Sequence, residues 1–344
     1  MERAELRRVA LGRSAPAPEV VSWLALALVM ALALSVGSVK VAPAALLAAL
    51  GDGLRGQLHG AVDTIVWQLR LPRVVMAALV GAALSLAGAA FQGVFRNPLA
   101  DPYLLGAASG AGFGATVVLV FAGAVPWLAR LGVPLAAFVC ALLAVAAVTL
   151  VARRGASLPA TSLILAGVVV GSSLTAATSF LMMASRDRAA GILSWLLGSF
   201  AFASWERLLP VVVLLLPAAL AILAAARALD VLQLGEEAAA QLGVPVEAVK
   251  MGLLAAATLA TAAAVSVAGV IGFVGLVAPH AVRLAFGAGH RRLLPLAALW
   301  GALFMVLADL AARTVVAPAD VPVGIVTALV GGPFFLALLR RQRA

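Results

Sequence analysis

The chain is poor in charged residues, and this shortage excludes a soluble fold. Charged residues make up 11% of its 344 residues, whereas apolar residues make up 64%. An average soluble domain has about 25% charged residues and roughly 45 to 50% apolar ones. A chain with so little charge needs lipid as its solvent, so we expect an integral membrane protein.

Lysine, cysteine and histidine are also scarce, which argues against several chemistries. Neither of the two lysines, Lys40 and Lys250, follows the glycines of a phosphate-binding loop, so ATP hydrolysis would have to occur on another chain. The single cysteine, Cys140, lies in an apolar run; it allows no intrachain disulfide and is predicted to be a small buried hydrophobe. Without H-E-x-x-H, G-x-S-x-G or a cysteine and histidine cluster, we expect no catalytic residue, metal or cofactor on this chain.

Apolar segments fill most of the chain, and most have about 17 to 25 residues, the length that crosses a bilayer as a helix. Strands of a transmembrane barrel alternate apolar and polar residues, whereas 163–183 is apolar on all sides. We therefore predict an all-α protein with a cytoplasmic N-terminal tail over 1–19 and a single transmembrane domain over 20–340. Ten spans are expected, at 20–38, 72–94, 101–123, 134–152, 160–183, 207–226, 251–269, 272–287, 293–316 and 322–339.

The net charge of +10 would suggest nucleic-acid binding in a soluble protein, but the basic residues here flank apolar segments. An even number of spans puts both termini on one side of the membrane. Both termini are basic, so the positive-inside rule places both in the cytoplasm. These terminal residues are Arg3, Arg7, Arg8, Arg13, Arg340, Arg341 and Arg343. The first apolar segment is interpreted as a retained span rather than a signal peptide, because many similar segments follow it.

Three segments depart from the pattern of simple spans. Segment 190–203 is too short to cross and predicts a helix at the outer surface. Segment 272–287 is short and interrupted by glycine, which predicts a tilted, kinked or partly covered helix. Segment 230–250 resembles a soluble helix, since Glu236 and Glu237 suit a first helical turn and Gly243 with Pro245 supplies a stop. This helix is expected in the cytoplasm, as a handle for a partner or as a linker.

Two polar residues within apolar segments leave alternatives open. Asp309 is the one acid deep in a span, with Arg313 four residues later on the same helical face. Asp309 is therefore either part of a local ion pair or polar helix contact, or a proton-coupling residue of a secondary transporter. His280 follows Pro279 and is either a metal or haem ligand or, as we favour, a hydrogen-bonded packing residue.

Small and hydroxyl residues near the cytoplasmic ends of two spans also have two interpretations. Gly106, Gly110 and Gly114 recur every four residues, which lets a second helix approach closely or leaves bare backbone along a passage. Asn97 and Asp101 each precede a proline and predict helix caps in a sharp turn. Thr161 and Ser162 can cap the helix that they begin.

Taken together, the motifs resemble the permease subunits of type II ABC importers for iron-siderophores, haem and cobalamin. The resemblance covers about 65–340, in order. It is carried by 69–73, Gly88, Gln92, 96–102, 105–106, 109–112, 234–237, 241–243, 268–280, 308–313 and 322–333.

The resemblance implies an assembly: two copies of the permease around a central pathway in a bacterial inner membrane, two cytoplasmic ATPases that bind Mg-ATP, and a periplasmic binding protein. It implies that a coupling helix grips the ATPase, with Leu234, Gly235, Glu236, Glu237, Gln241, Leu242 and Gly243. It implies docking of the binding protein on Arg70, Arg73 and Arg313. It further implies a pathway or gate formed by Thr161, Ser162, Gly106, Ser109 and Gly110.

The predicted function is therefore that of a transport subunit without catalysis of its own, importing an iron chelate, either an iron-siderophore or haem. Cobalamin is the alternative cargo. A proton-coupled transporter that uses Asp309 is less favoured. An intramembrane enzyme is disfavoured because the sequence offers no paired catalytic groups.

Overall fold

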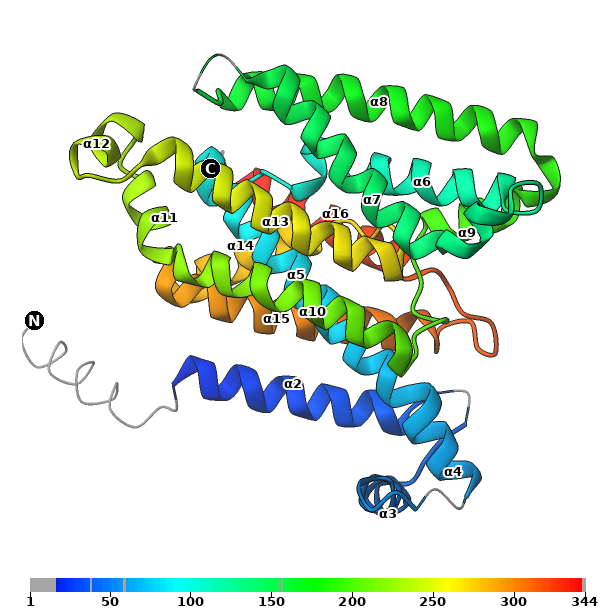
Figure 1. The fold of residues 1–344 in the computed structure, drawn as a ribbon. Coiled ribbons are helices and arrows are strands. Elements are labelled where there is room, and N and C mark those ends of the chain that lie inside the picture. The colour runs from blue at the N-terminus through cyan, green and yellow to red at the C-terminus, as the bar shows by residue number, and fades with distance from the viewer. Residues whose placement is uncertain (1–16, 38, 58–59, 154, 156, 342–344) are drawn as a thin grey trace, which may run out of the picture.

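The computed structural model describes residues 17–37, 39–57, 60–153, 155 and 157–341 (Figure 1). Ten main helices run alongside one another within these residues, each at the place of a predicted span, which confirms the predicted all-α architecture. They are α2 (Pro18–Ser35), α5 (Leu71–Phe95), α6 (Ala107–Phe121), α7 (Pro126–Ala152), α8 (Ala160–Ala184), α10 (Trp205–Ala224), α13 (Val246–Ala268), α14 (Val274–Phe286), α15 (His290–Ala312) and α16 (Val323–Arg341). The tail residues Arg3, Arg7, Arg8, Arg13 and Arg343 lie outside the described residues.

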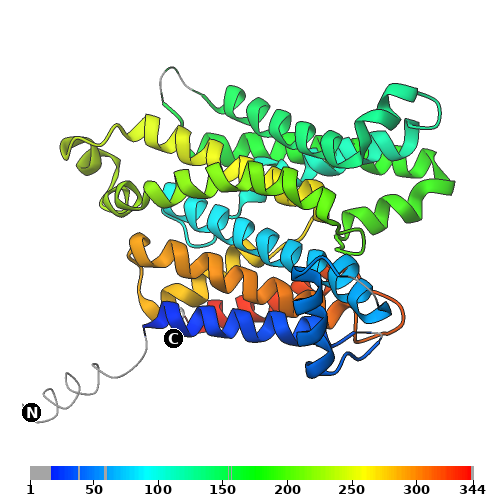
Figure 2. The ribbon, with the colours of Figure 1, turned by 60° about the horizontal axis from the view of Figure 1, so that its bottom comes forward.

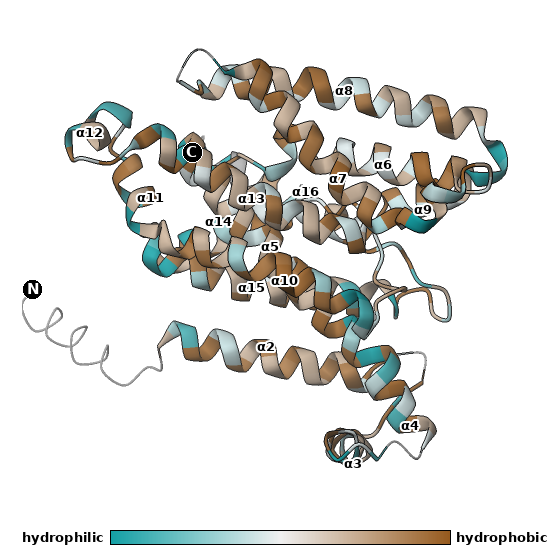
Figure 3. Ribbon diagram, viewed as in Figure 1, coloured by the Kyte–Doolittle hydropathy of each residue, from teal (hydrophilic) through white to brown (hydrophobic). Residues whose placement is uncertain are grey.

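Seven of these helices are long and apolar enough to cross a membrane by length and composition; α6, α14 and α16 contribute shorter apolar stretches. Apolar residues fill the helix bodies and polar residues gather near the helix ends (Figure 3). The molecule thus has two polar ends. We call them the α12 end and the α3 end, after the short helices α12 (Glu236–Gln241) and α3 (Pro43–Leu54) that mark them in Figure 1.

Burial separates central helices from peripheral ones. The apolar windows of α5 and α13 are 78% and 67% buried, whereas those of α2 and α8 are each 22% buried. Figures 1 and 2 show α2 along one edge of the bundle and α8 along the opposite edge. Helix α5 therefore lies at the centre of the bundle, while α2 and α8 expose most of their surface to lipid or to a partner.

Glycines allow the closest helix approaches. A side chain on Gly88 of α5 would place its Cβ 2.1 Å from the carbonyl oxygen of Gly275 on α14. On α6, a Cβ on Gly110 or Gly114 would lie 2.5 Å from the oxygen of Cys140 or 2.4 Å from that of Ala136, both on α7. The packing interpretation of the spaced glycines is thus confirmed for Gly110 and Gly114.

Several boundaries differ from the predicted ones. Helix α13 begins at Val246 rather than 251, because Glu247 and Lys250 are helical although charged. Helix α15 ends at Ala312 rather than 316. Helix α7 begins at Pro126 rather than 134; its first turns contain Arg130, which interrupts the apolar run, and Gly132, with φ of 72°, kinks the helix after them.

The remaining helices are short. The sequence predicted α9 (Ala189–Leu196) and α12, and both are confirmed as helices. It did not predict α3, α4 (Ala61–Thr64) or the π-helix η1 (Ile65–Arg70) that leads into α5. The others are η2 (Pro102–Leu105), η3 (Arg186–Arg188) and α11 (Ala226–Leu232).

Candidate functional site

Helix α12 projects from the bundle at the α12 end (Figure 1). It is bounded by Gly235 and Gly243, whose φ angles of 113° and 81° lie in the left-handed region that favours glycine. The flanking leucines Leu234 and Leu242 are 67% and 65% exposed. The predicted helix and its glycine stop are confirmed, and the turns leave two apolar side chains uncovered beside a short helix.

Lys250 joins α12 to the bundle. Its Nζ lies 3.1 Å from Glu236 Oε1 on α12 and 3.1 Å from Glu247 Oε1 on α13. The second carboxylate oxygen of Glu247 accepts a hydrogen bond of 3.1 Å from the backbone N of Leu158, just before α8. The buried lysine thus links α12 to α13, and its partner Glu247 links α13 to the segment before α8. Sequence reasoning missed this role, although the three-residue spacing of Glu247 and Lys250 was a signal of their pairing.

Helix α11 has its own anchors. Asp230 Oδ1 lies 2.8 Å from the backbone N of His290, which donates to it, and 2.7 Å from Nδ1 of the same residue. Gln233 Nε2 donates a 3.0 Å hydrogen bond to the carbonyl oxygen of Gly93 on α5. The segment that leads into α12 is therefore tied to α15 and α5, so α12 stands on a fixed base.

Four of the five predicted pathway residues lie on or beside α8, with Thr161 and Ser162 at its start and Gly106 and Ser109 nearer its middle. Thr161 is exposed and Ser162 half-buried, and neither hydroxyl caps the helix, whose N-cap is Pro159. Ser109 Oγ lies 3.3 Å from Thr175 Oγ1 across the contact of α6 with α8. Gly106 also lies near α8, whereas Gly110 is buried against α7. The structure therefore brings Ser109 and Gly106 to α8 and covers Gly110 with another helix.

The turn that leads into α6 forms as predicted. Asn97 Oδ1 accepts a hydrogen bond of 2.9 Å from the backbone N of Leu99, and Asp101 Oδ1 accepts one of 2.8 Å from that of Tyr103. The predicted helix cap is confirmed for Asp101, which begins η2, whereas Asn97 makes the same kind of contact in a turn that no helix follows.

The exposed face of α8 carries hydroxyl side chains as well as apolar ones. Ser172, Thr175 and Ser179 are exposed on it, beside Val168 and Leu165. A face that meets only lipid gains nothing from hydroxyls, because apolar chains cannot hydrogen-bond them. This face suits a water-filled passage or another protein chain.

A buried ionic joint lies at the α3 end. Arg73 Nε and Nη2 donate hydrogen bonds of 3.0 Å and 2.9 Å to Oδ1 of Asp309, and Arg73 Nη1 donates one of 2.7 Å to Asp320 Oδ2. Asp309 is 2% exposed. Arg313 Nε is 3.7 Å from Asp309, so the predicted local pair exists but is not the main one. The main partner, Arg73, is 236 residues away in sequence, which leaves no local signal.

The other two predicted docking arginines cap α2. Arg70 Nη1 donates to the carbonyl oxygens of Leu34 at 2.6 Å and Ser35 at 3.1 Å, and Arg313 donates to that of Ala33. Arginine stabilises a helix C-terminus by satisfying its last carbonyls and opposing its dipole. The three arginines thus lie at one end of the bundle, but Arg70 and Arg313 are buried.

His280 is packed inside the bundle. Its ring is buried and lies edge-on to Phe334, 6.5 Å between centroids, and neither ring nitrogen has a partner among the described residues. The packing role is confirmed, but the expected hydrogen bond is not found. No group of three or more histidine, cysteine or acidic residues suited to a metal occurs in the part of the chain described.

These features define a polytopic α-helical membrane protein with one short helix set outside its bundle. The chain belongs to the FecCD transport family, whose profile matches residues 25–341. The family resemblance inferred from the motifs is thereby confirmed.

Relatives match over most of this chain. It is 42% identical over 346 aligned residues to the uncharacterised ABC transporter permease YvrB of Bacillus subtilis, covering 99% of this chain and 98% of the relative. It is 44% identical to the cobalamin import system permease BtuC of Halobacterium salinarum, covering 81% and 74%. The hemin transport system permease HmuU of Yersinia pestis is 40% identical, covering 81% and 84%.

The fold also matches a solved structure, described as an inward-facing conformation of a metal-chelate type ABC transporter. The TM-score is 0.82 at 31% identity, covering 94% of this chain and 98% of that chain.

Proposed function

We propose that this chain is the membrane-spanning subunit of an ATP-driven importer that receives an iron chelate from a binding protein outside and releases it into the cytoplasm. The carrying observation is α12, a short helix that is flanked by two exposed leucines and is held to α13 by the ion pair of Glu236 with Lys250. Exposed apolar side chains at a polar end of the bundle indicate a surface that binds a partner. The proposed partner is a cytoplasmic ATPase.

The cargo is proposed from the relatives. Among them are permeases named for hemin in Yersinia pestis and for Fe(3+) dicitrate in Escherichia coli, which support an iron chelate. Permeases named for cobalamin or vitamin B12 are equally similar, so cobalamin is the second candidate. The chain offers no cluster of ligands for the metal itself among its described residues, in keeping with a cargo that stays chelated.

The proposed dimer uses the exposed, hydroxyl-bearing face of α8. A second copy of this chain facing it would enclose a passage lined by Thr161, Ser172 and Ser179. Hydroxyls would give such a passage polar but uncharged walls, which suit the transit of a bulky chelate without binding it tightly.

The proposed docking of the binding protein falls mainly on Arg73. Its guanidinium reaches Asp320, which is 35% exposed, so a carboxylate from outside has access to this pair. Arg70 and Arg313 would act indirectly by holding the end of α2. A reversal at Arg70 would put a carboxylate beside the carbonyls of Leu34 and Ser35, so only Arg73 offers a clean docking test.

The test is reconstitution in proteoliposomes with a partner ATPase and a binding protein. We expect uptake of a ⁵⁵Fe-siderophore or haem that requires ATP and is lost when Leu234 and Leu242 are both changed to Asp, with co-purification of the ATPase lost as well. Val315→Asp, at an exposed residue of the α3 end, is the control. Uptake by the permease alone, driven by a proton gradient, would instead support a secondary transporter; cyanocobalamin as the only accepted cargo would overturn the iron assignment.

A further inference from the structure

We propose that a groove beside α10 binds one anionic phospholipid, with an acyl chain between α5 and α10 and the phosphate between Arg227 and Arg291. Nothing in the proposed transport cycle requires this site. The proposal rests on the proposed function only for the side of the membrane, since the same topology places both arginines at the cytoplasmic border.

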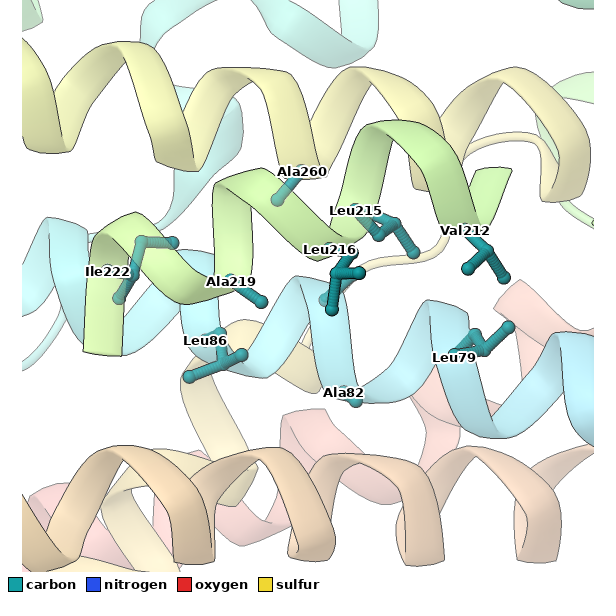
Figure 4. A pocket seen from close by; sticks show the side chains of 10 residues that line it. Leu79, Ala82, Leu86, Val212, Leu215, Leu216, Ala219, Ile222 and Ala260 are labelled. Atoms are coloured by element: carbon teal, nitrogen blue, oxygen red, sulfur yellow. The ribbon is translucent and has the colours of Figure 1, made fainter. Parts of the chain in front are cut away.

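The groove is purely apolar. Its empty space between α5 and α10 is about 520 Å³, part of which is open to the outside, and Ala260 of α13 also lines it. Figure 4 shows its side chains pointing into the space from both helices. They are Leu79, Ala82, Ala83 and Leu86 on α5, and Val212, Leu215, Leu216, Ala219 and Ile222 on α10. Such walls offer nothing to a polar ligand and suit a hydrocarbon chain.

The groove runs along the helix axes toward the α12 end. From Val212 to Ile222 an α-helix rises about 15 Å, half the thickness of the hydrocarbon layer of a bilayer. Leu216 remains 58% exposed at its edge, so the groove opens sideways to the membrane and not into the bundle. An acyl chain can therefore enter from the lipid.

A basic pocket follows where the groove ends. Leu223 and Ala224, directly after Ile222, line a pocket of about 470 Å³ together with Arg227 of α11 and Arg291 of α15. Both arginines are exposed. Within the residues that the structure describes, neither guanidinium has a hydrogen-bond or ion-pair partner.

The neighbouring Arg292 provides the contrast. It is also exposed, but its Nε donates a hydrogen bond of 2.9 Å to Glu19 at the start of α2. Among the described residues, Arg227 and Arg291 thus have no acidic partner, whereas Arg292 has one. The charge that would complement Arg227 and Arg291 must come from outside the described chain.

An apolar groove that ends at two unpaired guanidinium groups fits an amphiphile with a hydrocarbon tail and an anionic head. Guanidinium groups bind phosphate oxygens through two parallel hydrogen bonds. Basic pockets between membrane helices on the cytoplasmic side are where acidic headgroups bind. Since the groove lies at membrane depth, the occupant is a phospholipid and not a soluble phosphate.

The position gives the lipid a structural consequence. Arg227 lies in the first turn of α11, and α11 leads directly into α12. A phosphate that bridges Arg227 and Arg291 would join α11 to the start of α15, next to the contact of Asp230 with His290. The lipid would thereby stiffen the base on which α12 stands.

The test is native mass spectrometry of the full permease in detergent, titrated with phosphatidylglycerol or with phosphatidylcholine of the same chains. We expect one tightly bound phosphatidylglycerol, and about thirty-fold weaker binding in an Arg227→Gln, Arg291→Gln double variant, the effect of two arginine contacts at a membrane surface. Ala219→Trp, which fills the groove, should also weaken binding, whereas the control Arg292→Gln should leave it unchanged.

Three results would overturn the proposal: equal affinity for both lipids, an equal loss in Arg292→Gln, or full competition by inorganic phosphate, which would indicate a site for free anions. Loss of the lipid on dimerisation would mean that a second copy covers the groove. Because the permease is measured alone, failure of the lipid site and failure of the ATPase-dependent transport are observed separately.

Discussion

At each end of the bundle one cation joins separate helices, but the acids that meet it differ in exposure. At the α3 end, Arg73 binds Asp309, which is 2% exposed. At the α12 end, Lys250 is equally hidden, but Glu236 and Glu247 are 43% and 38% exposed. The first joint has one enclosed acid, Asp309, and a second acid at its outer edge, Asp320, which is 35% exposed, whereas both acids of the second joint are open to water.

The chemistry of the cations matches this difference. The guanidinium of Arg73 is a planar fork that fixes the angle of the carboxylate as well as its distance, whereas the ammonium of Lys250 is a point charge on a flexible stem. The α3 end therefore resists rearrangement, while the α12 end can change geometry without losing its pairing. If an ATPase binds α12 as proposed, the more adaptable joint lies at the end of the bundle where the partner's movement would arrive.

The largest expected effect on stability comes from removing Asp309, the enclosed acid that pairs with Arg73 at the α3 end. Asp309→Ala leaves Arg73 and Arg313 without their buried counter-charge, and breaking a buried pair in this way costs about 3 to 5 kcal/mol. We expect a marked drop in the thermal unfolding midpoint of the detergent-solubilised permease and low yield. An unfolding midpoint within a degree or two of the wild type would show that Asp309 is not an enclosed counter-charge.

A smaller effect on stability is expected from removing Lys250, which joins Glu236 and Glu247 at the α12 end. Lys250→Met removes the link of α12 to α13, but the glutamates it leaves can be solvated. Exposed ion pairs contribute about 0 to 1 kcal/mol, so the unfolding midpoint should change little. Instead, hydrogen exchange over 236–243 should accelerate a few-fold, the effect of losing about 1 kcal/mol or less, with Lys250→Arg closer to the wild type.

The exposed Lys40 provides the control for this variant, since Lys40→Met should leave exchange over 236–243 unchanged. If Lys250→Met unfolded the protein as strongly as Asp309→Ala, the two joints would be equivalent and the contrast between the ends would be wrong.

The sequence predicted the helices better than it predicted these joints, for a physical reason. Apolar length defines a span locally, so all ten main helices were found, and the glycines and acids of 230–243 marked α12. The joints depend on residues distant in the chain: Arg73 meets Asp309 only because α5 and α15 pack together. Arg70 was identified as a residue of this end, yet its burial against α2 follows from the tertiary fold alone.

The groove beside α10 likewise could not be predicted from local sequence patterns, because its two walls come from α5 and α10. Each wall by itself is an ordinary apolar helix face. Arg227 and Arg291 were predicted as flanking charges of spans, which explains their position at the border but not why they lack an acid. Only the packed arrangement distinguishes them from Arg292.

The smallest effect, and the one that best separates docking from stability, is expected for Asp320→Asn. Asp320 is 35% exposed and pairs only with the outer nitrogen of Arg73, so its loss should cost about 1 kcal/mol or less. The same change frees Arg73 Nη1 for a carboxylate of the binding protein, so docking measured by surface plasmon resonance should become a few-fold tighter. Arg73→Gln should weaken docking in the same assay. If Asp320→Asn weakened docking too, Asp320 itself would be part of the surface that the binding protein contacts, and the joint at the α3 end would extend to the outer face of the molecule.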